Sequence, residues 1–199
     1  MIAVVDYGAG NIRSVVKALE TVGAHVTVSY KPESISKAEK IVLPGVGHFG
    51  KAVESLKERG LFAPLQEAIH QGKAFLGICL GFQLLFPASQ ESAGAQGLGC
   101  LKGSVEHLPN SLKVPHLGWN RVRQPGDSPL WAGIPEDTYF YFAHSYYVRP
   151  EEKRFITGST EYGGPFTSAM GNEMLFGVQF HPEKSQRWGL LLLENFVQL

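Results

Sequence analysis

The chain has 199 residues, which is enough for one substantial hydrophobic core and short for two domains. Hydrophobic residues make up 44% of it and charged residues 18%, a balance typical of globular rather than disordered proteins. Eighteen basic residues match eighteen acidic ones, and no basic run stands out. We therefore expect neither nucleic acid nor an anionic membrane as a partner.

The cysteine content and the N-terminus indicate the compartment. Cys79 and Cys100 are too few for a disulfide framework in a chain of this size, and no CxxC or histidine-rich spacing predicts a metal site. Residues 1–6 lack the basic and long apolar regions of a signal peptide, and no apolar run reaches transmembrane length. We expect a cytoplasmic protein that uses no metal and no cofactor.

Apolar runs alternate with helical patterns over the first half of the chain. Strands are expected at Ile2–Val5, 26–30, 40–43 and 74–78, and helices at 12–19, 52–59 and 64–71, with Gly23 as a helix C-terminal cap. Alternation of this kind predicts an open, largely parallel, doubly wound α/β sheet.

The second half is richer in β-like segments. After a surface loop expected at 88–99, aromatic and β-branched residues predict strands at 114–123, 138–148, 155–160 and 174–180. These strands are expected to extend the sheet in antiparallel fashion. A helix at Gln186–Gln198 ends the chain. Because no repeat, linker or break is visible, residues 1–199 are expected to form a single domain.

Two glycine-containing loops follow predicted strands. The turn at 6–11, DYGAGN, lacks the third glycine of a dinucleotide fingerprint, so a plain turn or a contact surface is favoured over phosphate binding. The loop at 44–47, PGVG, leaves a strand at the edge where ligands bind in open α/β sheets. Its spacing alone favours an ordinary turn over a backbone donor for an oxyanion.

The segment 73–86, KAFLGICLGFQLLF, passes from an apolar run to helical spacing across one reactive side chain. Gly77 and Gly81 stand two residues before and after Cys79, the pattern of a nucleophile elbow. At a helix start the dipole favours the thiolate, and the N–H of Leu80 points where an oxyanion forms. A strand-to-helix turn with an inert buried thiol fits the same string.

A nucleophilic cysteine needs a base and a group that orients the base. His181 ends the apolar run at 174–180 and is followed by Pro182 and Glu183, so Glu183 can orient His181 while Cys79 lies on its other side. His144, inside an aromatic run, is interpreted as a packed core histidine. The remaining histidines are interpreted as structural or solvated: His25, His48, His70, His107 and His116.

Two motifs carry a resemblance to a known family. Residues 77–83, GICLGFQ, and 177–183, GVQFHPE, resemble the class I, triad-type glutamine amidotransferases. Within that family the chain is similar to the glutaminase subunits of imidazole glycerol phosphate synthase, on the strings DYGAGN, PGVG, PHLGWN (115–120), YFAHSYY (141–147) and Lys184-Ser185. Phe82 stands where methionine is usual, and SQE (89–91) is less acidic than is common.

The resemblance implies an activity and a set of site residues. Cys79, His181 and Glu183 would form the catalytic triad that hydrolyses glutamine to glutamate and ammonia. The oxyanion hole would combine the N–H of Leu80 with one from Val46–Gly47. The glutamine pocket would be lined by Gly47, Gln83, Glu91, Ser145 and Tyr146; from the sequence alone, a solvated loop carboxylate is the default interpretation of Glu91.

The resemblance also implies a partner. A separate (βα)8-barrel cyclase would take up the ammonia and make imidazole glycerol phosphate and an aminoimidazole carboxamide ribonucleotide, in a heterodimer with this chain. Candidate interface residues are Asn11, Trp119, Tyr141 and Lys184.

Three alternatives stay open at this point. A Cys-His hydrolase of the α/β-hydrolase or thioesterase type is disfavoured because Glu183 follows His181 by two residues, whereas the acid of those enzymes precedes the histidine by a long stretch. A non-catalytic binding or stress-response protein would use Cys79 as an oxidisable thiol. A glutaminase subunit feeding a different synthase is opposed only by the subfamily strings.

Overall fold

The computed structural model describes residues 1–8 and 10–199. Ala9, inside the glycine-rich turn expected at 6–11, lies outside the described residues. In the part of the chain that the structure describes, no helix is long and apolar enough to cross a membrane.

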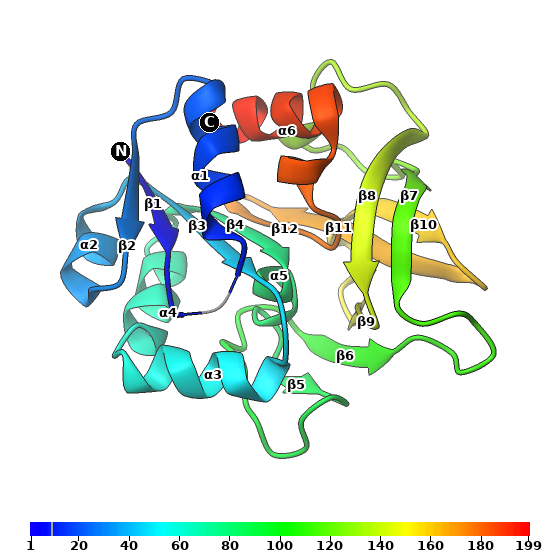
Figure 1. The fold of residues 1–199 in the computed structure, drawn as a ribbon, viewed down its shortest axis with the longest axis horizontal. Coiled ribbons are helices and arrows are strands. Elements are labelled where there is room, and N and C mark those ends of the chain that lie inside the picture. Colours follow the sequence, from blue (N-terminus) through cyan, green and yellow to red (C-terminus); the bar gives the residue numbers. More distant parts are fainter. Residues whose placement is uncertain (9) are drawn as a thin grey trace.

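Parallel strands form one half of the main sheet (Figure 1). Strands β1 (Ile2–Val5), β2 (Val26–Ser29), β3 (Lys40–Gly45) and β4 (Ala74–Cys79) lie in the order β2-β1-β3-β4, each parallel to its neighbour. The helices between them are α1 (Ile12–Thr21), α2 (Pro32–Lys37), α3 (Phe49–Glu58) and α4 (Phe62–His70). The predicted α/β architecture is confirmed; α2 had no sequence prediction.

Strands β1, β3 and β4 are buried on both faces, which explains why they are largely continuous apolar runs, whereas the edge strand β2 is only partly buried. Alternate residues of the three buried strands enter two separate cores. Leu43 and Phe75 pack with α3 and α4, whereas Val42 and Leu76 pack with α1 and the last helix, α6 (Gln186–Gln198). Figure 1 shows α1 and α6 on one side of the sheet and α3 and α4 on the other.

The sheet continues with strands from the second half of the chain. Next to β4 lies β12 (Leu175–Val178), parallel to it, and then β11 (Pro165–Asn172), β9 (Tyr146–Pro150) and β6 (Gly103–His107), each antiparallel to the strand before it. The edges are completed by β5 (Ala88–Ser89), parallel to β6, and β10 (Ile156–Glu161), antiparallel to β11. The antiparallel extension is therefore confirmed.

One predicted strand, 138–148, is wrong as a single element. The chain forms β8 (Thr138–His144) and then β9, interrupted at Ser145. β8 pairs with β7 (His116–Val122) in a separate two-stranded sheet, while β9 joins the main sheet. Because of this break, the two halves of one aromatic segment belong to two different sheets. Strand propensity alone does not predict such a division.

Smaller differences concern element ends. The helix after Cys79, α5, covers only Leu80–Gln83; Pro87 disfavours helical geometry at Phe86 and so helps end the helical segment. Pro44 and Gly45 belong to β3 rather than to a loop, and the loop at 88–99 begins with β5. Strands β6 and β11 had no prediction. Short 3₁₀ helices lie at Pro129–Trp131 (η1), Lys153–Phe155 (η2) and Pro182–Lys184 (η3).

Candidate active site

Three neighbouring parallel strands bring the candidate residues to one edge of the sheet. Gly45, at the end of β3, pairs with Cys79, at the end of β4, and Val178 of β12 pairs with Ile78. The loop after Gly45 therefore starts beside the cysteine, and His181 lies three residues beyond Val178 on its other side. This carboxyl edge is where open α/β sheets place their ligands.

Cys79 sits on a sharp turn between β4 and α5. Its φ of +54° and ψ of −110° are unusual for a residue with a side chain. A Cβ on Gly81 would lie 1.8 Å from the Leu43 carbonyl oxygen, and one on Gly77 would lie 2.8 Å from the backbone of Phe82. The two glycines are thus needed because backbone passes so close to them, which is the geometry of a nucleophile elbow.

The helix that follows the cysteine corrects one expectation. With four residues, α5 is about one turn long, so it offers only a small dipole to favour a thiolate.

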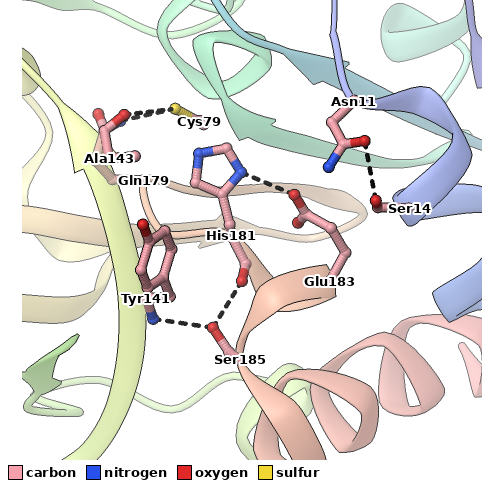
Figure 2. A network of polar contacts seen from close by, with 9 residues as sticks. All are labelled: Asn11, Ser14, Cys79, Tyr141, Ala143, Gln179, His181, Glu183 and Ser185. Carbon is pink, nitrogen blue, oxygen red and sulfur yellow. Dashed lines mark hydrogen bonds and ion pairs between the residues drawn. The ribbon is translucent and has the colours of Figure 1, made fainter. Parts of the chain in front are cut away.

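His181 and Glu183 form a buried pair. The Nδ1 of His181 lies 2.9 Å from Oε1 of Glu183, and their side chains are 2% and 1% exposed. Figure 2 shows the other ring nitrogen, Nε2, on the side of Cys79. Among the described residues Nε2 has no hydrogen-bond partner, so it is free to serve a reacting group.

The backbone around His181 is held by strand β8. The N–H of His181 donates to the Tyr141 carbonyl at 2.8 Å, and the N–H of Tyr141 donates to Oγ of Ser185 at 3.0 Å. The Ser185 hydroxyl in turn donates to the His181 carbonyl at 2.6 Å. Figure 2 shows the two hydrogen bonds of the Ser185 hydroxyl. Together the three hydrogen bonds tie the histidine to the two-stranded sheet.

The charge of His181 is set by its neighbours. Burial favours the neutral ring and lowers the pKa, but the negative charge of the Cys79 thiolate and the pairing with Glu183 outweigh it and raise the pKa of His181 to about 10. The arrangement therefore favours the imidazolium form of His181 at neutral pH.

A cavity of about 170 Å³ opens over Cys79. Seven further residues named from the sequence line it, drawn from four separate parts of the chain: Val46, Gly47, Leu80, Gln83, Glu91, Ser145 and Tyr146. Pro115, Ala143 and His144 complete the lining. The break at Ser145 turns this segment of chain into the cavity wall, which explains why no strand pattern pointed to it.

Glu91 is not a solvated loop carboxylate. Its Oε2 accepts a hydrogen bond from the N–H of Phe49 at 2.6 Å, in the first turn of α3, and Oγ of Ser92 accepts from the N–H of Gly50 at 2.9 Å. These contacts satisfy N–H groups that a helix start leaves unpaired. They fix Glu91 and Ser92 against α3, with Glu91 at the wall of the cavity.

His144 is a hydrogen-bonded core histidine, as interpreted from the sequence. Its Nδ1 lies 2.8 Å from the Tyr146 carbonyl, and its Nε2 lies 2.9 Å from Nδ1 of His116. Burial lowers the pKa of His144 to about 3 and that of His116 to about 4. Both rings are therefore neutral at neutral pH, in contrast to His181.

Comparison with known families identifies the family of this chain. The model of the family described as "Glutamine amidotransferase class-I" matches residues 3–199. The chain belongs to this family. It is a glutamine amidotransferase, and family membership removes the α/β-hydrolase alternative.

Curated relatives of this amidotransferase cover its whole length. The chain is 50% identical over 198 residues to the "Imidazole glycerol phosphate synthase subunit HisH" of Moorella thermoacetica, covering 100% of this chain and 94% of the relative. It is 47% identical over 202 residues to "Imidazole glycerol phosphate synthase subunit HisH 1" of Methanococcus maripaludis, covering 100% of both.

Solved structures support the fold. One titled "Crystal structure of glutamine amidotransferase" superposes with a TM-score of 0.79 at 17% identity and covers 100% of both chains. The "Structure of PurLQS from Thermotoga maritima" gives 0.78 at 21% identity, over 99% of this chain and 95% of that one.

The four interface candidates of this amidotransferase divide into a cluster and a separate residue. Trp119 and Tyr141 pair across β7 and β8 with ring centroids 6.1 Å apart, and Nζ of Lys184 lies 5.8 Å from the Tyr141 ring. Trp119 is 46% exposed. Asn11 precedes α1 and accepts a hydrogen bond from the Ser14 hydroxyl. Gln179, beside Cys79, was given no role by sequence reasoning.

Proposed function

We propose that this chain is the glutaminase subunit of an imidazole glycerol phosphate synthase, and that residues 1–199 act as one glutaminase domain. The observation that carries the proposal is the buried His181–Glu183 pair, with Nε2 of His181 facing a cysteine that sits at a strained elbow and lines a cavity. The relatives at about half identity over the whole chain support the choice of subfamily.

In the first half of the reaction the Cys79 thiolate attacks the side-chain amide carbon of glutamine. The Sγ–C bond forms, and the electron pair of the carbonyl moves onto oxygen. When the intermediate collapses, the C–N bond breaks and Nε2 of His181 gives its proton to the leaving ammonia. The raised pKa of His181 means that this proton is already in place.

In the second half a water molecule hydrolyses the glutamyl thioester. Neutral His181, oriented by Glu183, takes a proton from the water, whose oxygen attacks the acyl carbon. The C–S bond then breaks, the electron pair returns to sulfur, and glutamate leaves. The imidazolium and thiolate are thereby restored.

The oxyanion of each tetrahedral intermediate is assigned to backbone donors. The N–H of Leu80 follows the nucleophile directly, and Val46 and Gly47 follow the residue that pairs with Cys79. Gly47 has a φ of +103°, and a Cβ added to it would meet no atom within 4 Å, so this loop has room to reorient its peptide. We assign the remaining polar lining to glutamine binding, namely Gln83, Glu91, Ser145 and Tyr146.

Ammonia released into water would be protonated and lose its nucleophilicity, so it must pass directly to the next enzyme. We propose a heterodimer with a (βα)8-barrel cyclase in the cytoplasm, docked on the face that carries Asn11, Trp119, Tyr141 and Lys184. Tyr141 links this face to the active site, because its carbonyl and N–H hold the His181 segment. The chemistry assigned to this chain requires no metal or cofactor.

The test is glutamate release from glutamine by the purified chain, alone and with the cyclase subunit and its nucleotide ligand. We expect strong stimulation by the liganded partner and loss of activity in Cys79→Ala. Equal activity with and without the partner would retain the glutaminase and reject this synthase as its destination. No activity under either condition would return Cys79 to the status of an inert or redox-active thiol.

A further inference from the structure

The side chain of Gln179 contacts the sulfur of Cys79. It is fully buried just after β12, and its Nε2 lies 3.7 Å from the Sγ of Cys79, within hydrogen-bonding distance for sulfur. The labelled view in Figure 2 places it next to the cysteine. Neither the triad nor the oxyanion hole uses it.

The orientation of the Gln179 amide follows from its neighbours. The carbonyl oxygen of Tyr146 can only accept hydrogen bonds, so the Gln83 atom 2.9 Å from it must be Nε2. The same nitrogen lies 3.1 Å from the Gln179 side chain and has one hydrogen left to donate, so the Gln179 atom that it contacts is Oε1. The NH₂ group of Gln179 consequently faces the sulfur.

A donor at this position suits a thiolate better than a thiol. A thiol must place its own hydrogen, and the acceptor that the structure shows for it is the Ala143 carbonyl, at 4.0 Å. A thiolate accepts hydrogen bonds and needs donors, and hydrogen bonds to charged groups are the stronger ones. With α5 too short to contribute much, the Gln179 amide is a directed donor for that charge.

We propose that Gln179 is a catalytic residue whose side-chain amide donates a hydrogen bond to the Cys79 sulfur and stabilises it as the thiolate. The proposal rests on the proposed role of Cys79 as the nucleophile. The amide acts before attack, when the charge is on sulfur, and again when the C–S bond of the thioester breaks and the electron pair returns to sulfur. Gln83 and the Tyr146 carbonyl are positioning groups that hold the amide in this orientation.

The test measures thiolate formation without glutamine turnover. In a Cys100→Ala background, which leaves Cys79 as the one thiol of the sequence, the rate of alkylation by iodoacetamide is followed against pH; the thiolate displaces iodide. Gln179→Met removes the donor and retains the bulk. For Gln179→Met we expect the midpoint of the rate profile to rise by about one pH unit. Well below the midpoint, this shift corresponds to a rate about tenfold lower than that of the parent. The plateau rate at high pH should be similar in the two proteins.

Gln179→Glu separates electrostatics from packing. The carboxylate keeps the acceptor for Gln83 but places a second oxygen, without a hydrogen, against the sulfur, so the midpoint should rise further than in Gln179→Met. The matched control is Gln66→Met. Gln66 lies on α4, and its amide donates to the Leu98 carbonyl at 2.7 Å. The alkylation midpoint of this variant should not move. Midpoints of both Gln179 variants within about 0.2 units of the parent would overturn the proposal.

A second measurement does not depend on how the variants fold. In the unsubstituted Gln179 protein, the NMR signals of the Gln179 side-chain NH₂ should shift when alkylation removes the charge on Cys79, and unchanged signals would also overturn the proposal. A displaced alkylation midpoint in a chain that does not release glutamate would refute the proposed function and the catalytic role of Gln179, and would leave only its hydrogen bond to the Cys79 thiolate. Glutamate release with an undisplaced midpoint would retain the proposed function and overturn this inference.

Discussion

At the scale of single residues, the surroundings of each histidine ring set its protonation. The negative charge of Cys79 and the pairing with Glu183 raise the pKa of His181, whereas His144 and His116, in the same region of the fold, are held neutral by burial. Chemically identical rings therefore have opposite roles. Their surroundings, and not their sequence neighbours alone, decide which ring carries the proton.

This contrast predicts a pH effect on one ring. In the parent, His181 should stay protonated through neutral pH and lose its proton only near its pKa of about 10. In Cys79→Ala the thiolate charge is gone but burial, which favours the neutral ring, remains, so the midpoint should fall. Ring ¹⁵N shifts of labelled histidine followed against pH measure this directly. Cys100→Ala is the control and should titrate like the parent; equal midpoints in Cys79→Ala and the parent would contradict the assignment.

At the scale of elements, the elbow depends on close approach between the backbones of β3, β4 and α5. The turn from β4 into α5 brings Gly81 against the Leu43 carbonyl of β3 and Gly77 against α5 itself. Strand β3 thus supports Cys79 from one side, while the loop after β3 continues toward the proposed oxyanion position. The glycine pattern in the sequence marked this turn correctly, whereas the shortness of α5 depended on the residues after Gln83.

This close approach predicts a large loss of stability for Gly81→Ala. The added Cβ would lie 1.8 Å from a backbone oxygen that cannot move aside without disturbing β3, so we expect a loss of about 3 kcal/mol or more in the free energy of unfolding. Gly72→Ala, with a φ of +73° and open space around the new Cβ, should lose only about 1–2 kcal/mol from backbone strain. Urea unfolding of both variants makes the comparison, and equal losses would rule out the close contact as the cause.

At the scale of the whole molecule, the two-stranded sheet connects an exposed surface to the reaction centre. Tyr141 of β8 accepts a hydrogen bond from the backbone N–H of His181. The ring of Tyr141 lies beside the exposed Trp119 of β7. Leu117 and Tyr139, on the same two strands, are 65% and 50% exposed. A partner docked here would touch the strand that holds the backbone of His181.

This arrangement predicts where the proposed cyclase subunit binds. Trp119→Ala should raise the dissociation constant by about tenfold or more, because buried tryptophans dominate many interfaces, and should leave the unfolding transition nearly unchanged. Tyr30→Ala, equally an exposed aromatic at 56% but at the end of β2, should bind as the parent does. Calorimetric titration with the cyclase subunit measures the dissociation constant of each variant. A raised dissociation constant in both variants, or in neither, would place the interface elsewhere.

The sequence by itself determined the features that depend on local order and periodicity. The parallel strands, most of their helices, the elbow at Cys79 and the neighbouring His181 and Glu183 all follow from apolar runs, glycine spacing and a short motif. Only the tertiary structure decided the features that depend on strands meeting across the chain. The interruption at Ser145, the anchoring of Glu91 on α3 and the placement of Gln179 against the sulfur result from contacts between residues tens of positions apart. No periodicity encodes such contacts, because they exist only once β4, β8 and β12 have come together in the folded chain.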